Sequence, residues 1–192
     1  YRPQQGTFEF QKGPLFHNLV LADEINRAPA KVQAALLEAM AERQITVGGA
    51  SYQLPSLFMV MATQNPIEND GTYPLPEAQL DRFFFNLFID YPTIEEEEEI
   101  VRRTLGHSEP VAEAILTADD VLALQEAAVD IPLPDPVVKS ILKLVHSSRP
   151  GTEAASDFVN NYVSYGAGPR ASQCLAKAVR ALALLRGKSA AS

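Results

Sequence analysis

The chain is organised around residues 19–27, which read LVLADEINR. A short apolar run ends there in the adjacent carboxylates of Asp23 and Glu24, and a helix-period pattern follows. Apolar runs of this kind are typical of strands that are buried on both faces of a parallel sheet. Ligands of open α/β sheets bind beyond the carboxyl ends of such strands. One acid could therefore orient a hydrated Mg²⁺ and the other polarise a water, although a solvated turn after a strand explains the same residues.

Composition limits the class of protein. A chain of 192 residues can form one large domain or two small ones with a real core. Its formal charge of −8 argues against nonspecific binding to nucleic acid or to anionic membranes. The single cysteine, Cys174, excludes an internal disulfide, and no apolar stretch approaches the ~18 residues of a membrane span. We therefore expect a cytoplasmic protein with no direct nucleic-acid binding and no membrane span.

Two further apolar runs indicate more strands of the same sheet. Residues 57–62 form one run, which again ends in polar residues, among them Asn65. Residues 83–89 form the other, and we predict a third strand there. The fold class that this pattern predicts for residues 1–91 is α/β, with a parallel sheet.

The segments between these runs predict helices and a hairpin. Residues 29–43 place apolar side chains at helical spacing, with Pro29 at the first position. Two short alternating segments flank Gly48-Gly49-Ala50, which indicates a β-hairpin. Residues 66–76 contain several prolines and predict a loop, and residues 77–82 predict a short helix. Residues 7–10 alternate like a further strand.

The second half of the chain carries helical patterns only. Thr93 with Glu96 and Thr117 with Asp120 both have the spacing of a capping box, which marks the start of a helix. The composition changes near residue 91. We therefore predict two domains, an α/β part over residues 1–91 and an all-helical part over residues 92–192.

Three further polar residues are candidates for the same site. Asn65 follows the second strand and offers both a donor and an acceptor, although an Asx turn before Pro66 explains it equally well. Arg170 follows Pro169 at a helix start, where a cation opposes the helix dipole by roughly 0.3–1 kcal/mol unless a phosphate binds there. A surface ion pair with Asp157 or another acid is the alternative. Arg82 ends the short helix, and either pairs with an acid such as Glu77 or Asp81 or reaches a neighbouring subunit's nucleotide.

Five segments together resemble the MoxR family of AAA+ ATPases. They read LADEINRAP (21–29), ERQITVGG (42–49), ATQNPIE (62–68), YPLPEAQLDRF (73–83) and GAGPRAS (166–172). They follow one another in the family's order and span most of the chain. The resemblance implies a partial AAA+ core followed by an all-helical lid domain.

The same resemblance implies a role for each candidate residue. Asp23 and Glu24 match the Walker B pair, in which Asp23 acts on Mg²⁺ and Glu24 activates the hydrolytic water. Asn65 matches sensor 1, Arg82 the arginine finger that acts on a neighbouring subunit, and Arg170 sensor 2 of the lid. The implied cofactors are ATP and Mg²⁺. The hairpin resembles the family's pre-sensor 1 insertion, and residues 6–16 the end of its helix 2 insertion.

The chain departs from the family pattern in one respect. It has no phosphate loop of the form GxxxxGKS or GxxxxGKT, which family members carry further upstream. Gly187-Lys188-Ser189 does not supply one, because the earlier glycine is missing and the segment follows a predicted helix. We therefore expect a fragment that is inactive by itself.

By the resemblance, the intact protein is a ring-forming ATPase, expected as a hexamer, that remodels a protein client. A protein with a von Willebrand factor A domain is the partner that the family implies. Two alternatives stay open at this point. One is the ATPase subunit of a magnesium-chelatase-type metal-insertion complex, and the other is a non-catalytic interaction module with the same fold.

Overall fold

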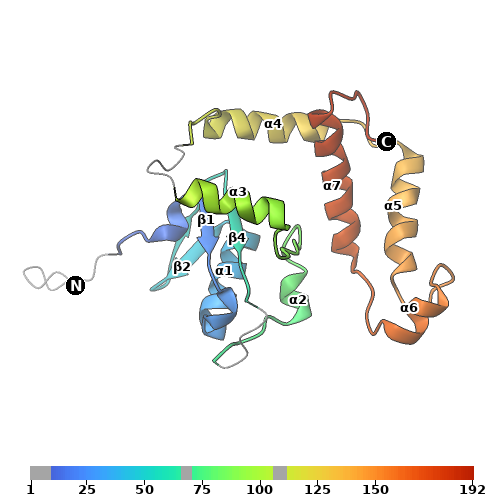
Figure 1. The fold of residues 1–192 in the computed structure, drawn as a ribbon, viewed down its shortest axis with the longest axis horizontal. Coiled ribbons are helices and arrows are strands. Elements are labelled where there is room, and N and C mark those ends of the chain that lie inside the picture. The colour runs from blue at the N-terminus through green and yellow to red at the C-terminus, as the bar shows by residue number, and fades with distance from the viewer. Residues whose placement is uncertain (1–9, 66–70, 106–111) are drawn as a thin grey trace, which may run out of the picture.

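The computed structural model describes residues 10–65, 71–105 and 112–192. A small α/β unit is followed along the chain by a run of helices (Figure 1). The strands are β1 (Leu19–Ala22), β2 (Gln44–Val47), β3 (Ala50–Gln53) and β4 (Met59–Ala62). The α-helices are α1 (Ala30–Glu42), α2 (Glu77–Leu80), α3 (Ile94–Thr104), α4 (Ala118–Asp130), α5 (Asp135–Ser147), α6 (Asp157–Tyr162) and α7 (Pro169–Leu185). Two short 3-10 turns, η1 (Pro14–Phe16) and η2 (Ile25–Arg27), flank β1.

Strands β1 and β4 pair in parallel and lie side by side in Figure 1. Their register pairs Leu19 with Met59 and Ala22 with Ala62, so both strands end at the same edge. Helix α1 and the hairpin lie between them in the chain, as a parallel pair requires a crossover connection. The predicted α/β class with a parallel sheet is therefore confirmed.

The core of the α/β unit lies between this strand pair and α1. One cluster of buried residues contains Ile25, Leu36, Leu37 and Leu75, and a second contains Ala39, Leu54 and Phe58. Val20, Ala22, Val60 and Ala62 pack against these clusters from the strands. Burial of each large apolar side chain contributes about 1.5–3 kcal/mol. The packing of α1 therefore fixes the position of the strand ends.

The other face of the strand pair differs from the sequence-based expectation. Side chains alternate between the two faces of a strand, so Leu19, Leu21, Met59 and Met61 point away from α1. Leu19 is 62% exposed and Leu21 63% exposed. The prediction of a strand buried on both faces is therefore wrong for this face, because no other described element packs against it closely enough to bury it.

The hairpin forms as predicted. Strands β2 and β3 pair antiparallel, with Val47 opposite Ala50. Gly48 and Gly49 have φ angles of 60° and 81°. Positive φ at both central residues is what the tight two-residue turn between twisted strands needs, and glycine reaches it without a steric penalty. Phe10 stacks on Tyr52 with ring centroids 4.2 Å apart, which joins the start of the described chain to β3. Most of the strand expected over residues 7–10 lies outside the described residues.

The predicted third strand over residues 83–89 is not formed. The segment has no regular secondary structure, and only Phe83 packs against the core. Phe88 is 92% exposed and Ile89 is 94% exposed. An apolar run becomes a strand only when neighbouring strands take up its backbone N–H and C=O groups, and the β1–β4 sheet does not extend to this segment.

The regular secondary-structure elements described after residue 91 are all helices, as predicted. Helix α7 packs against both α4 and α5. Both capping boxes are present: the hydroxyl of Thr93 accepts from the Glu96 N–H at 3.3 Å, and that of Thr117 from the Asp120 N–H at 3.2 Å. Hydrogen bonds from the Thr117 side chain and backbone lower the pKa of the Asp120 carboxyl below its usual 3.8. The domain boundary near residue 91 stays a prediction.

Two details of the helical part refine the sequence analysis. Helix α6 is not among the elements that the sequence analysis predicts, and the hydroxyl of Ser156 caps it by accepting from the Val159 N–H at 3.3 Å. Gly187 ends α7 with a φ of 63°. The N–H groups of Gly187 and Lys188 donate to carbonyls of the last helical turn at 3.0 and 2.9 Å, so this Gly-Lys-Ser segment is a helix end.

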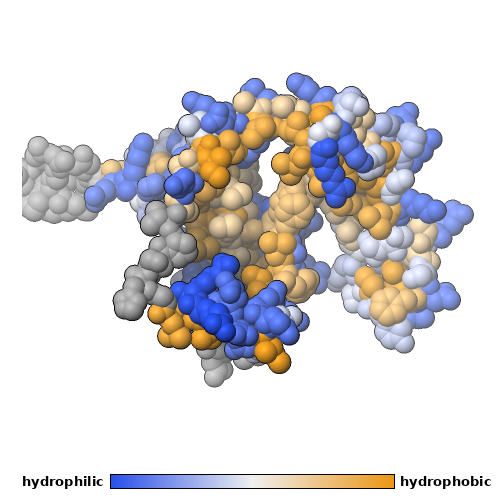
Figure 2. All heavy atoms as spheres, turned by 45° about the horizontal axis from the view of Figure 1, so that its top comes forward, coloured by the Kyte–Doolittle hydropathy of each residue, from blue (hydrophilic) through white to orange (hydrophobic). Residues whose placement is uncertain are grey.

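Large apolar side chains remain on the surface. Figure 2 shows apolar surface in orange beside hydrophilic surface in blue on the face that it presents. Phe85, Leu87 and Tyr91, which follow α2, belong to this exposed set. Within the described ranges, none of the helices combines the length and apolar character needed to cross a bilayer.

We expect Leu37→Ala to lower the free energy of unfolding by about 2–5 kcal/mol, because Leu37 is 3% exposed at the centre of the core cluster. Urea denaturation followed by circular dichroism measures the change. Val32→Ala on the same helix is the control, since Val32 is 52% exposed and the change there should stay within about 0.5 kcal/mol. Equal losses in the two variants would contradict the packing described here.

Candidate functional site

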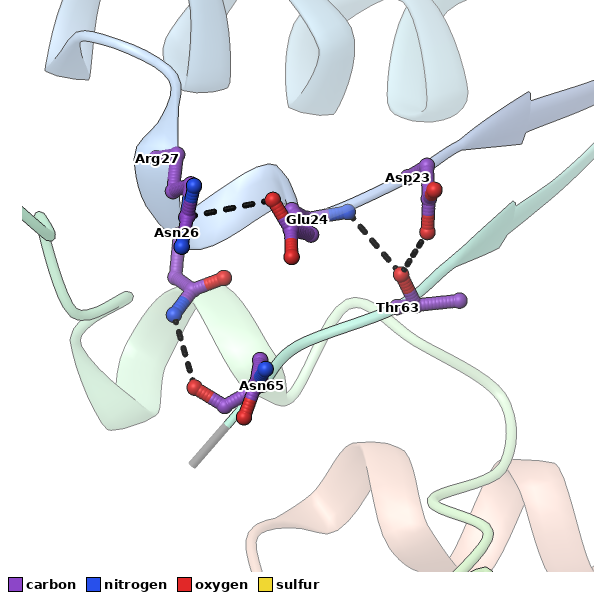
Figure 3. Close-up of polar contacts among 6 residues, drawn as sticks. All are labelled: Asp23, Glu24, Asn26, Arg27, Thr63 and Asn65. Carbon is purple, nitrogen blue, oxygen red and sulfur yellow. Dashed lines mark hydrogen bonds and ion pairs between the residues drawn. The ribbon is translucent and has the colours of Figure 1, made fainter. Parts of the chain in front are cut away.

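Asp23 and Glu24 stand directly beyond the end of β1, as the sequence predicts. Glu24 adopts the left-handed conformation, with φ 48° and ψ 50°. This conformation costs a residue with a Cβ roughly 1–2 kcal/mol. It turns the chain sharply into η2, and Figure 3 shows the Asp23 side chain directed to Thr63 while that of Glu24 is directed to Arg27. The two neighbouring carboxylates therefore have separate environments.

Thr63, the first residue after β4, is hydrogen-bonded to every residue from 22 to 25. Its N–H donates to the Ala22 carbonyl at 3.1 Å, and its carbonyl accepts from the Ile25 N–H at 3.0 Å. Its hydroxyl donates to Asp23 Oδ1 at 2.5 Å and accepts from the Glu24 N–H at 2.9 Å (Figure 3). The two strand ends are thus joined by side-chain as well as backbone hydrogen bonds.

Glu24 forms an ion pair with Arg27. The distance from Arg27 Nε to Glu24 Oε2 is 3.1 Å, and both side chains are partly exposed. An ion pair of this exposure contributes at most about 1 kcal/mol, because water screens it. The pair positions the Glu24 carboxylate without fixing it strongly.

Asn65 lies on the same edge of the sheet as the two carboxylates. The backbone carbonyl of Asn65 accepts a hydrogen bond from Asn26 Nδ2 at 3.3 Å (Figure 3). Asn26 is 8% exposed, and its backbone carbonyl accepts a hydrogen bond from the Tyr73 N–H at 2.6 Å. The parallel pairing of β1 and β4 therefore brings Asp23, Glu24 and Asn65 together, as expected.

Gln33 on α1 is hydrogen-bonded to the backbone at this edge of the sheet. It is 3% exposed, and its Nε2 donates to the Ile25 carbonyl at 3.1 Å and to the Tyr73 carbonyl at 2.8 Å. Asn26, Gln33 and Thr63 were not among the residues that sequence reasoning selected. The available signal for Gln33 was its spacing of three, four and seven residues from Leu36, Leu37 and Met40, which places an amide on the buried side of the helix.

The two candidate arginines lie elsewhere. Arg82 follows α2, and its Nη1 donates to the Leu37 carbonyl of α1 at 3.3 Å. Arg170, in the first turn of α7, has its Nη1 3.6 Å from Asp81 Oδ2. The alternative of a surface ion pair is the one present here, with Asp81 as the acid. Among the contacts of the described residues, none joins either arginine to the strand-end carboxylates.

The chemistry of the strand-end residues fits Mg²⁺ brought in by a nucleotide. Asp23 is exposed, and its hydrogen bond to Thr63 uses Oδ1 only. Residues 10–65, 71–105 and 112–192 contain no group of three or more His, Cys, Asp or Glu side chains that could hold a metal. Mg²⁺ is usually bound by one or two carboxylates together with water and substrate phosphates. One carboxylate at this edge is therefore a suitable protein ligand.

Comparison with known proteins identifies the class of this fold. The sequence model of the ATPase family associated with various cellular activities (AAA) matches residues 1–85. A solved structure from Cytophaga hutchinsonii, described as a proposed ATPase, superposes with a TM-score of 0.90 at 39% identity. The match covers 100% of this chain and 58% of that one. The fold is that of an AAA+ ATPase core followed by its helical part.

Within this class the chain belongs to the MoxR family. It is 47% identical to the chaperone MoxR1 of Mycobacterium tuberculosis, a match over 98% of this chain and 50% of the relative. It is 41% identical to the uncharacterized protein YeaC of Bacillus subtilis, over 96% of this chain and 55% of the relative. Protein MoxR of Paracoccus denitrificans is 30% identical over 97% of this chain. The chain spans about half the length of the first two of these relatives.

We expect Gln33→Leu to lower the free energy of unfolding by about 1–3 kcal/mol. Leucine fills the same space but removes the Gln33 donor from the Tyr73 carbonyl and one of the two donors from the Ile25 carbonyl, which keeps the Ala28 N–H. The midpoint of urea denaturation gives the change. Lys31→Leu on the exposed side of α1 should shift stability by no more than about 0.5 kcal/mol, and a similar loss in both variants would point to surface hydrophobicity as the cause.

Proposed function

We propose that the protein hydrolyses ATP and that Asp23, Glu24 and Asn65 form the part of its active site contributed by this chain. The observation that carries the proposal is the parallel register of β1 and β4, which sets these polar residues at one edge of the sheet. The site matches the place where open α/β sheets bind their ligands. The AAA family match and the MoxR relatives support nucleotide hydrolysis as the reaction.

The proposed roles follow from the contacts of each side chain. Asp23 would hold Mg²⁺, which neutralises charge on the phosphates when bound. Glu24 has one oxygen, Oε2, in contact with Arg27, so Oε1 can accept a hydrogen bond from a water and take up its proton. The Asn65 side-chain amide would orient that water or contact the terminal phosphate, since it can both donate and accept.

Arg170 is proposed to bind the terminal phosphate in an arrangement that differs from the one described above. Its present partner, Asp81, is 43% exposed and lies at 3.6 Å, so the pair contributes at most about 1 kcal/mol. A guanidinium binds phosphate through two parallel hydrogen bonds that are roughly twice as strong as neutral ones. The phosphate would therefore displace Asp81 once it lies within reach of α7.

The activity of the whole protein is proposed by analogy with its relatives. A ring in which Arg82 acts on the neighbouring subunit's nucleotide would place the active sites between subunits, and we expect a hexamer in the cytoplasm. The name of the Mycobacterium tuberculosis relative, a chaperone, supports remodelling of a client protein as the work that ATP hydrolysis drives. A partner with a von Willebrand factor A domain remains the expectation from the family resemblance.

In the protein expressed from its complete gene, Glu24→Gln should retain ATP binding and lose turnover by at least about a hundredfold, because the amide cannot take up the water's proton. A coupled-enzyme assay measures turnover, and fluorescence of a labelled nucleotide measures binding. Glu126→Gln, an exposed glutamate of α4, is the matched control and should behave as wild type. Normal turnover in Glu24→Gln would rule out the proposed role.

Arg82→Ala should also abolish turnover, because the active site of the neighbouring subunit loses a cation. In comparable phosphoryl transfer such an arginine raises kcat by roughly 10³–10⁵-fold. Mixing Arg82→Ala with Glu24→Gln subunits tests whether the arginine acts between subunits. Each variant alone is inactive, whereas a mixed ring joins an intact Arg82 to an intact Glu24. Activity should return in the mixture, and its absence over a range of mixing ratios would favour a role for Arg82 within its own subunit, as in its contact with α1.

A further inference from the structure

We propose that Thr63 is a positioning residue, whose hydroxyl holds the Asp23 carboxylate in the orientation that receives Mg²⁺. The inference rests on the proposed ATP hydrolysis and adds a residue to its site. It is carried by the two hydrogen bonds of the Thr63 hydroxyl, one to Asp23 Oδ1 at 2.5 Å and one from the Glu24 N–H at 2.9 Å.

The direction of both hydrogen bonds is fixed by their partners. A backbone N–H can only donate, so the Thr63 oxygen must accept from Glu24. The single hydroxyl hydrogen is then left for the carboxylate, which accepts it through Oδ1. Because the hydroxyl cannot rotate without losing one of these bonds, it holds Asp23 in one orientation.

This orientation matters because Asp23 would be the main protein ligand. The described residues offer no cluster of acidic, histidine or cysteine side chains that could bind a metal unaided. Mg²⁺ requires nearly ideal octahedral geometry, so a single carboxylate has to present its free oxygen in the right direction. The hydrogen bond to Oδ1 leaves Oδ2 for that purpose, and residues that orient a ligand typically change metal affinity by 10–100-fold when replaced.

The hydroxyl is not needed for the strand pairing itself. The Thr63 backbone is bonded to Ala22 and Ile25 through its N–H and carbonyl, and neither bond involves the side chain. Thr63 is also exposed, so water can replace the hydroxyl as the acceptor for the Glu24 N–H. Replacing Thr63 by valine, which has the same shape, therefore removes the positioning hydrogen bond while the β1–β4 pair is retained.

The test compares Thr63→Val and Thr63→Ser in the protein expressed from its complete gene. Mn²⁺ serves as the probe, and electron paramagnetic resonance counts the free ion during titration in the presence of ADP. We expect Thr63→Val to weaken Mn²⁺ binding by roughly 10–100-fold and Thr63→Ser, which keeps the hydroxyl, to bind close to wild type. Thr46→Val in the hairpin is a matched control for the substitution, because among the described residues the hydroxyl of Thr46 is hydrogen-bonded to Ser51, away from the strand-end carboxylates.

A second measurement separates positioning from general damage. Turnover of Thr63→Val should be low at limiting Mg²⁺ and recover toward wild type as Mg²⁺ is raised, while its thermal melting temperature stays near that of wild type. If valine impairs folding, Thr63→Ala takes its place in the same titration.

The outcomes distinguish this inference from the proposed function. Wild-type Mn²⁺ affinity in Thr63→Val, or equal weakening in the valine and serine variants, would overturn the role of the hydroxyl and leave ATP hydrolysis standing. If wild-type protein mixed with ADP binds no more Mn²⁺ than the same concentration of ADP without protein, both the role of Thr63 and the proposed ATP hydrolysis would be overturned.

Discussion

The parallel pairing of β1 and β4 is the constraint on which the rest of the site depends. Because residues 22 and 62 are paired, the next residues of both strands leave the sheet at the same edge. A shift of the register by one residue would turn every side chain of one strand to the opposite face. It would also move Thr63 away from the Asp23 carboxylate. The fold and the polar site are therefore set by the same hydrogen bonds.

The left-handed conformation of Glu24 directs the side chains of Asp23 and Glu24 at the sheet edge to different partners. A residue with a Cβ adopts it only when its surroundings hold it there. Here the Glu24 N–H is bound by the Thr63 hydroxyl, and the Arg27 N–H donates to the Glu24 carbonyl at 2.8 Å. The turn separates the Asp23 and Glu24 side chains, so that one can face a metal and the other a water.

Sequence patterns predicted the elements that depend on local chemistry. The Gly48-Gly49 hairpin, the capping boxes of α3 and α4, and the meeting of Asp23, Glu24 and Asn65 at one edge all follow from turn residues, cap spacing and the geometry of parallel strands. The strand expected over residues 83–89 was wrong because hydrophobicity alone does not supply a pairing partner. The expected burial of both faces of β1 was also wrong, because burial depends on which other elements pack against the strand, and the apolar sequence of the strand does not determine that.

Long-range polar contacts could not be derived from one sequence. Thr63 lies 40 residues from Asp23, and only the register of the sheet makes them partners. Arg170 and Asp81 are likewise distant along the chain, and the sequence analysis named Asp157 or another acid as the possible partner, whereas the structure pairs Arg170 with Asp81. Polar residues inside predicted elements, such as Gln33, are the positions where a pattern of hydrophobic spacing gives the least guidance.

The two hydrogen bonds of the Gln33 amide have a mechanical consequence. One holds the chain as it leaves the strand edge, and the other holds the segment that leads into α2 and Arg82. Separating the edge from that segment would strand a buried amide hydrogen, at about 1–3 kcal/mol. The Gln33 amide thus keeps the Ile25 and Tyr73 carbonyls at a fixed separation, so a displacement of one segment also displaces the other.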